Sequence, residues 1–112
     1  LVDVAVLIGE RRNFISALIS PDFEQLQSWA TENGVTFDDI EDLLRKSEVL
    51  AVFQEVVDSV NGVLARYEQV REFRLLPETL SIESGFLTPT LKVKRRVVNE
   101  RFADIIKGIY SS

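Results

Sequence analysis

The sequence predicts one α+β domain in which helices cover a small, mainly antiparallel sheet of about three strands. Two observations support this fold class. β-Branched and apolar runs of strand length occur at residues 2–8, 14–19 and 70–76, and apolar residues recur at helical spacing in the segments between and after them. The length of 112 residues suits a single modest core. We therefore expect residues 1–112 to form one domain.

The first two strands are expected to form an N-terminal hairpin. Residues 2–8 and 14–19 are separated by a short polar connection, Glu10-Arg11-Arg12-Asn13, which suits a turn between antiparallel neighbours. The third strand, residues 70–76, comes much later. It is stopped by Pro77, which cannot donate a backbone hydrogen bond to a sheet.

Helices are expected between the second and third strands. Pro21 suits the first position of one helix, and Asn33-Gly34 suits its left-handed end. Thr36-Phe37-Asp38-Asp39 is typical of a capping box before a short helix that runs through Leu44. Ser47 is expected to cap the longest helix. The apolar face of that helix is expected to consist of Val49, Phe53, Val56, Val60 and Leu64.

Residues 77–91 are expected to form a long connection, with a turn at Ser84-Gly85 and a short paired segment around residues 80–82. A final helix is expected over residues 94–110. Its inner face would carry Val97, Val98, Phe102, Ile105, Ile106 and Ile109.

Composition excludes several classes of function. The net charge of −5 disfavours a general nucleic-acid binder, because binding driven by phosphates needs a basic surface. The absence of cysteine and histidine excludes disulfides, Cys/His zinc sites and Ser-His-Asp triads within this chain. An acidic cluster at residues 38–42 lacks the spacing of an EF-hand, and first-turn acids on a short helix account for it. No metal site is therefore predicted.

The chain has no methionine and begins inside a strand-like run, so we expect a domain cut from a longer protein. The longest apolar run, Val4 to Gly9, is too short for a membrane span or a signal peptide.

Residues 84–96 are the segment from which a function can be predicted. After the expected turn the chain reads Leu87-Thr88-Pro89-Thr90-Leu91, and Lys92 follows shortly before the final helix. A single cation presented by a loop can stabilise negative charge that develops on a reacting phosphate or carboxylate oxygen. Lys92 is therefore the candidate catalytic residue. The loop that carries it includes Gly85, Thr88, Pro89 and Thr90.

Gly85 to Arg95 reads G-F-L-T-P-T-L-K-V-K-R. This segment resembles the closing motif of the AMP-forming long-chain acyl-CoA synthetases, which are part of the adenylate-forming enzyme superfamily. Further similarity runs through residues 4–12, 14–19, 60–61 and 68–73, and so spans nearly the whole chain. The chain thus resembles the small C-terminal domain of such a synthetase, and the hinge and the N-terminal ATP-binding domain would precede Leu1.

The resemblance implies a long-chain fatty acid–CoA ligase that works in two steps. The fatty carboxylate attacks the α-phosphate of ATP and gives an acyl-adenylate and pyrophosphate, and the thiol of coenzyme A then displaces AMP. Lys92 would serve the first step, after which this mobile domain would swing away, and the domain alone would be inactive.

The partners implied by the resemblance are the N-terminal domain of the same polypeptide, a fatty acid and coenzyme A, with no nucleic acid. ATP and Mg²⁺ would be bound mainly by the N-terminal domain. The full-length enzyme would be cytoplasmic or peripherally associated with a membrane.

The other basic residues are less specific. Lys94, Arg95 and Arg96 could attract a nucleotide or the phosphates of coenzyme A, face an acidic surface of a partner domain, or be solvated at a helix start. Arg11 and Arg12 in the hairpin turn could bind a phosphate of coenzyme A or decorate the surface.

One departure from the wider superfamily stands directly before the lysine. Many adenylate-forming enzymes have glycine there, and this chain has Leu91, as the long-chain subgroup does. Two non-catalytic alternatives also stay open. One is a module that holds an anionic lipid or a phosphorylated ligand with the patch from Lys92 to Arg96. The other is an interaction domain that has lost catalysis.

Overall fold

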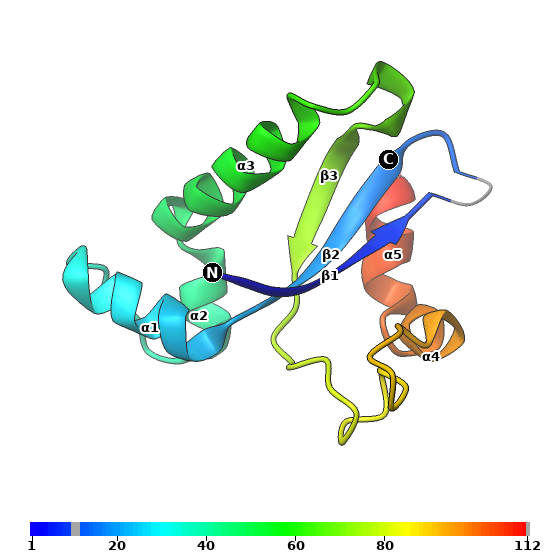
Figure 1. Cartoon of the computed structure of the whole chain (residues 1–112). Coiled ribbons are helices and arrows are strands. Elements are labelled where there is room, and N and C mark those ends of the chain that lie inside the picture. The colour runs from blue at the N-terminus through cyan, green and yellow to red at the C-terminus, as the bar shows by residue number, and fades with distance from the viewer. Residues whose placement is uncertain (10–11, 112) are drawn as a thin grey trace.

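The α+β class and the three-stranded sheet are confirmed by the computed structural model, which describes residues 1–9 and 12–111. The strands are β1 (Val2–Ile8), β2 (Ile15–Pro21) and β3 (Val70–Leu75). The helices are α1 (Phe23–Glu32), α2 (Ile40–Arg45), α3 (Ser47–Asn61), the 3-10 turn η1 (Arg66–Glu68), α4 (Arg95–Arg101) and α5 (Ala103–Tyr110). In Figure 1, helices α1 to α3 gather on one side of the sheet and α4 and α5 on the other.

The sheet has the order β1-β2-β3 and contains one antiparallel and one parallel pair. β1 and β2 form the predicted hairpin, with Val6 opposite Leu18. β3 runs parallel to β2, with Ala17 opposite Phe73. A parallel neighbour needs a long crossover connection, and α1 to α3 supply it.

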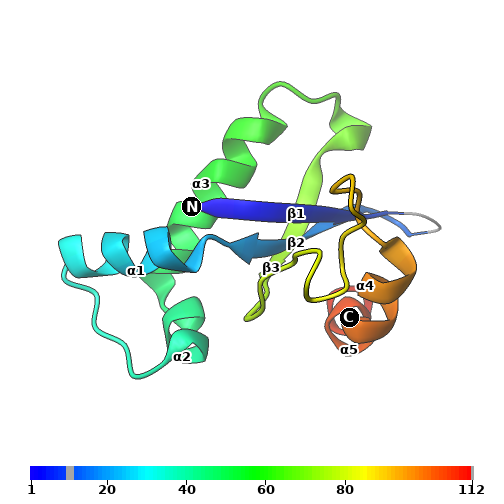
Figure 2. The same ribbon diagram turned by 60° about the horizontal axis from the view of Figure 1, so that its bottom comes forward.

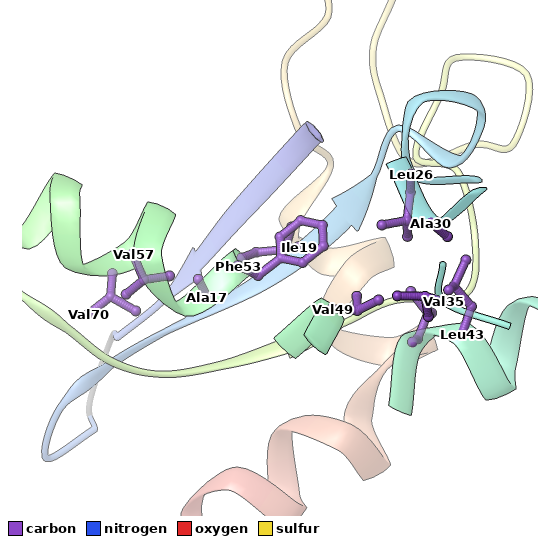
Figure 3. Close-up of a cluster of buried hydrophobic side chains, with 11 residues drawn as sticks. Ala17, Ile19, Leu26, Ala30, Val35, Leu43, Val49, Phe53, Val57 and Val70 are labelled. Carbon is purple, nitrogen blue, oxygen red and sulfur yellow. The ribbon is translucent and has the colours of Figure 1, made fainter. Parts of the chain in front are cut away.

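Strand β2 contributes to two hydrophobic cores, one on each face of the sheet. Ala17 and Ile19 point toward α1, α2 and α3, where Phe53 is fully buried. Figure 3 shows Phe53 reaching from α3 to Ile19 on β2. Leu18 points the other way, into a core with Val6 of β1 and residues of α4 and α5. This alternation follows from the two-residue side-chain period of a strand.

The start of α1 differs from the prediction, while its end agrees with it. Pro21 is the last residue of β2 and not the first of a helix. Asp22 is the N-cap, and its carboxylate accepts a hydrogen bond from the backbone N–H of Gln25 at 3.1 Å. At the other end Gly34 has φ +70°, the left-handed conformation that was expected there.

Helices α2 and α3 are separated by Lys46 alone, which ends one helix and precedes the other. The cap of α2 is Asp39, which accepts from the N–H of Asp42 at 2.8 Å, so the cap lies three residues after the expected Thr36. The prediction that Ser47 caps α3 was wrong. Ser47 is the first helical residue, because the one-residue link leaves the flanking position to Lys46.

The inner face of α3 was predicted partly wrong. Val49, Phe53 and Val57 are buried, whereas the side chains of Val56 and Val60 are 39% and 48% exposed. Val56 and Val57 are adjacent and both apolar, so the spacing alone does not decide which of them faces the core. Leu64 lies beyond the end of the helix.

The expected final helix over residues 94–110 is two helices. α4 and α5 meet at Phe102, whose backbone leaves helical geometry at φ −110° and ψ 24°. Val97, expected inside, is 36% exposed. In Figure 2 both helices lie beside each other at the end of the connection from β3. Within the described residues none of the helices combines the length and apolar character that crossing a membrane requires.

The connection before α4 also differs from the prediction. No paired segment forms at residues 80–82 in the described structure, and a single antiparallel bridge joins Leu87 and Val93 instead. The expected turn at Ser84-Gly85 is present. Ser84 Oγ accepts from the N–H of Ser81 at 2.9 Å, and Gly85 has φ +86°.

Candidate functional site

Lys92 lies at the end of the loop of a small hairpin. The N–H of Thr88 donates to the carbonyl of Lys92 at 2.8 Å, and the N–H of Lys94 donates to the carbonyl of Phe86 at 2.8 Å. The N–H of Leu91 donates back to the carbonyl of Thr88, also at 2.8 Å, which closes a tight turn. Residues 86–94, which we call the motif hairpin, therefore form a closed backbone unit around the tip at residues 89–91.

Leu91 completes this turn in the left-handed conformation, with φ +63°. A three-residue hairpin loop commonly places a left-handed residue at this position, and glycine is the usual occupant. A Cβ atom makes this conformation unfavourable by roughly 1–2 kcal/mol. Leu91 stands where the resemblance places glycine in many adenylate-forming enzymes, and it adopts this conformation despite its side chain.

The hydroxyls of the two threonines bond within the loop. Thr88 Oγ1 accepts from the N–H of Lys92 at 3.0 Å and lies 3.0 Å from Thr90 Oγ1. Pro89 stands between them and fixes its own φ near the value that the second position of the turn needs. These contacts hold the backbone of Lys92 to the opposite side of the loop.

The base of the motif hairpin is anchored in the core formed with α4 and α5. Phe86 and Leu87 are buried, and Val93 packs against the same core. The ring of Phe86 stacks on Phe102, with centroids 5.5 Å apart. Lys92 itself is exposed, and no salt bridge engages it among the described residues. A rigid support thus presents a free ammonium group to whatever covers this surface.

The other residues of the basic run point to different partners. Helix α4 begins at Arg95, so Lys92 precedes it by three residues and belongs to the hairpin. Arg95 donates through NH1 to the carbonyl of Leu7 on β1 at 2.7 Å. Arg96 pairs with Glu100 at 3.2 Å, both largely exposed, and Lys94 stays exposed at the N-cap of α4. The run from Lys92 to Arg96 is therefore not one continuous patch.

A second group of basic residues meets in a cavity of about 780 Å³ between the end of β1 and helices α4 and α5. Arg12 and Arg95 line it, so the structure brings together two candidates that are far apart in the sequence. Lys107 and Tyr110 line it as well, and sequence reasoning missed both. No local pattern could have found them, because each looks like an ordinary residue of a helix. Arg11, also a candidate, lies outside the described residues.

The acidic cluster acts as a helix cap. Asp42 Oδ2 accepts from the N–H of Asp38 at 3.0 Å, and Lys46 Nζ lies 3.5 Å from the same oxygen. The hydrogen bond from Asp38 is the main cause that lowers the pKa of the Asp42 carboxyl below its ordinary value, and the charge of Lys46 adds to it. Among residues 1–9 and 12–111, no three His, Cys, Asp or Glu side chains are grouped to hold a metal ion.

Comparison with known proteins identifies the family. The family model of the AMP-binding enzyme C-terminal domain matches residues 1–112. The chain belongs to this family. This C-terminal domain is 38% identical over 112 residues to the long-chain-fatty-acid–CoA ligase FadD15 of Mycobacterium tuberculosis, with 99% of the chain and 19% of that relative covered. It is 37% identical over 101 residues to human long-chain-fatty-acid–CoA ligase 1, with 88% and 14% covered.

Solved structures show the same fold. The adenylation domain of the carboxylate reductase from Mycobacterium chelonae has a TM-score of 0.66 and 22% identity, and the match covers all of this chain and 16% of that one. The corresponding domain from Segniliparus rugosus, solved with AMP and a co-purified carboxylic acid, has a TM-score of 0.64 and 22% identity. That match covers 99% of this chain and 16% of the Segniliparus rugosus chain. The chain thus spans a fifth or less of the proteins that it matches.

Proposed function

We propose that this chain is the mobile C-terminal domain of a long-chain fatty acid–CoA ligase and that it supplies Lys92 to the formation of the acyl-adenylate. The observation that supports this most directly is the placement of Lys92 on the motif hairpin. The side chain is exposed and free of salt bridges in the described structure, while its backbone is fixed by Thr88 and by the buried residues at the base. A preorganised cation of this kind stabilises developing charge without rearranging.

In the first step, a carboxylate oxygen of the fatty acid forms a bond to the α-phosphorus of ATP, and the bond to pyrophosphate breaks. Both reactants are anionic, so their approach is electrostatically unfavourable. The ammonium group of Lys92, placed between the carboxylate and the α-phosphate, reduces this repulsion and offsets the charge of the transition state.

In the second step, the thiol of coenzyme A adds to the acyl carbon and AMP leaves. Lys92 is no longer needed there, and the domain turns away so that a different face closes the site. Domain movements of this kind gate many multistep reactions. In this proposal the N-terminal domain binds most of the ATP and its Mg²⁺, and this domain contributes Lys92.

The test is Lys92→Ala in the intact parent enzyme, with the two half-reactions measured separately. Release of pyrophosphate should fall by roughly 10²–10³-fold, the usual cost of removing one preorganised stabilising group. Transfer from added acyl-adenylate to coenzyme A should be retained. Lys46→Ala is the matched control, because Lys46 lies at the start of α3 and pairs with Asp42.

Equal loss in both half-reactions would contradict the assignment of Lys92. If both half-reactions survived, the motif would be structural, and a non-catalytic anion-binding or interaction module would be the better proposal. Arg95 bonds to Leu7 and Arg96 pairs with Glu100, so the two arginines have separate partners. This argues against an anion-binding module that uses Lys92 to Arg96 as one continuous patch.

A further inference from the structure

We propose that the outer edge of strand β3 pairs with the same edge of a second copy of this chain, in an antiparallel arrangement with two-fold symmetry. β3 is the last strand in the order β1-β2-β3, and among the described residues no strand lies beyond it. Figure 1 shows β3 at the margin of the sheet, with α3 alongside. An unpaired edge offers a row of backbone hydrogen-bonding groups to another strand.

The backbone groups that face outward on β3 belong to alternate residues. The N–H of Leu76 donates to the carbonyl of Ile19 on β2 at 2.8 Å, so the backbone of Leu76 faces β2. Because this direction alternates along a strand, Phe73 and Leu75 present their N–H and C=O groups to the outside. The guanidinium of Arg74 donates to the carbonyl of Phe73 at 2.8 Å, which agrees with this orientation. Phe73 is therefore the residue about which two copies of β3 can exchange a pair of hydrogen bonds.

The charges next to Phe73 complement each other when two copies pair. An antiparallel arrangement that places Phe73 opposite Phe73 also places Glu72 of each copy opposite Arg74 of the other. These flanking pairs are the ones without backbone hydrogen bonds, in which opposite side chains approach most closely. The same strand thus supplies both halves of each ion pair, which selects a second copy of this chain as the partner.

The single chain holds these groups in a form that can be exchanged. Glu72 and Arg74 lie 3.3 Å apart within one chain, and their side chains are 50% and 45% exposed. On pairing, each side chain turns to the opposite charge on the other copy. The carbonyl of Phe73, which Arg74 covers in the single chain, then accepts from the N–H of Phe73 in the other copy.

A hollow of about 820 Å³ beside this edge gives the second copy an apolar surface to cover. Helix α3 lines it with Ser47, Leu50, Ala51 and Gln54, which have the i, i+3, i+4, i+7 spacing of one helical stripe. Leu50 in this stripe is 39% exposed. A two-fold axis through the strand pair brings both stripes to the same face of the joined sheet, where the small side chains of Ser47 and Ala51 allow the helices to approach.

This inference does not depend on the proposed role of Lys92. The motif hairpin contributes none of the residues that form the β3 edge or line the hollow. Pairing of two copies and catalysis by Lys92 are therefore separate predictions, and either can fail alone.

The test is sedimentation velocity of the chain over a range of concentrations, because the chain has two hydrophobic cores made of its own side chains. The wild-type chain should pass from monomer to dimer as the concentration rises. Glu72→Arg and Arg74→Glu each place like charges opposite one another in both ion pairs of the dimer. Each should raise the dissociation constant of the dimer by more than about ten-fold.

An equimolar mixture of these two variants distinguishes a contact between copies from an effect within one chain. One variant carries two arginines at positions 72 and 74 and the other carries two glutamates, so both cross-strand pairs again have opposite charges. The mixture should form a heterodimer with a dissociation constant near that of the wild-type chain. The ion pair within each chain stays broken in both variants, so it cannot account for the recovery.

Glu100→Arg and Arg96→Glu are the matched controls, because they break an exposed ion pair of α4 with the same changes of charge. Each control, alone or in a mixture, should dimerise as the wild-type chain does. Far-UV circular dichroism shows whether each variant has folded. If a charge reversal on β3 unfolds the chain, Leu50→Glu tests the same surface from α3 and should also prevent the dimer.

Three results would overturn the proposal. The first is a wild-type chain that stays monomeric at the highest concentration reached. The second is a mixture of Glu72→Arg and Arg74→Glu that does not associate although both variants are folded. The third is a loss of dimer in Glu100→Arg as large as in Glu72→Arg, since the effect would then be one of net charge.

Discussion

Leu91 holds a left-handed backbone conformation in the residue directly before Lys92. Its side chain is 67% exposed, so it gains little from burial that could offset the conformational cost. The resemblance implies that leucine stands where glycine is more common, but the sign of φ depends on the hydrogen bonds that close the motif hairpin. The position of the candidate lysine could therefore be predicted from the motif, whereas the strain next to it could not.

Leu91→Gly is expected to leave the free energy of unfolding unchanged or to raise it by up to about 1 kcal/mol. The gain comes from relief of the left-handed conformation, and the greater flexibility of glycine in the unfolded chain reduces it. Urea denaturation of both proteins measures the difference. Leu50→Gly serves as the control, because Leu50 lies within α3 and glycine there should destabilise by about 1 kcal/mol. Clear destabilisation by Leu91→Gly would contradict the role of φ.

At the level of single residues, the basic run also shows where sequence reasoning ends. Lys92 to Arg96 reads as one cluster, but Arg95 bonds to Leu7 on β1, far away in the sequence, and Arg96 pairs with Glu100 one helical turn later. Conversely, Arg12 and Lys107 look unrelated in the sequence and line one pocket. The contacts of Arg12, Arg95 and Lys107 depend on long-range geometry, which a local sequence pattern does not give.

At the level of elements, the existence and order of strands and helices were predictable, and several boundaries were not. The break between α4 and α5 at Phe102 could not be predicted, because no glycine or proline occurs at that position. The ring of Phe102 is buried against Phe86, a contact between segments that the sequence does not relate. The caps at Asp22 and Asp39 were displaced from their expected positions because several capping residues stand close together and only the fold selects one of them.

Because of the cap of α2, the free energy of unfolding is expected to fall as the pH is lowered into the acidic range. The pKa of Asp42 is lowered in the folded state, mainly by the N–H of Asp38. Its contribution to stability is therefore present at pH values above the unfolded pKa of about 3.9, and it is lost as pH falls through the lower folded value. Titration of the carboxyl signals by NMR should show Asp42 below the ordinary value. In Asp42→Asn the free energy of unfolding should fall less steeply as the pH is lowered. An unchanged pH dependence would contradict the contribution of Asp42.

At the level of the whole molecule, the proposal treats this domain as a lid that completes an active site held mainly by another domain. The larger cavities of the described structure are open and lie on separate sides of the fold, and none combines Lys92 with a nucleotide-sized hollow. We therefore expect the chain of 112 residues to show no ATP-dependent formation of acyl-CoA by itself. A thioester assay on the purified chain measures this, with the intact parent as positive control. Activity in the isolated chain would show that a complete site exists within it.

The hydroxyl of Tyr110 bonds to the carbonyls of Ile8 and Phe14 and lies 2.9 Å from the hydroxyl of Ser16, and so joins residues that are 94 to 102 positions apart. These contacts fasten α5 to the hairpin of β1 and β2. The core that supports Lys92 is assembled from both ends of the chain, whereas the core of α1 to α3 draws mainly on the residues between them. During synthesis on the ribosome, helices α1 to α3 can pack before α5 has been made, whereas the support beneath Lys92 cannot form until α5 is present.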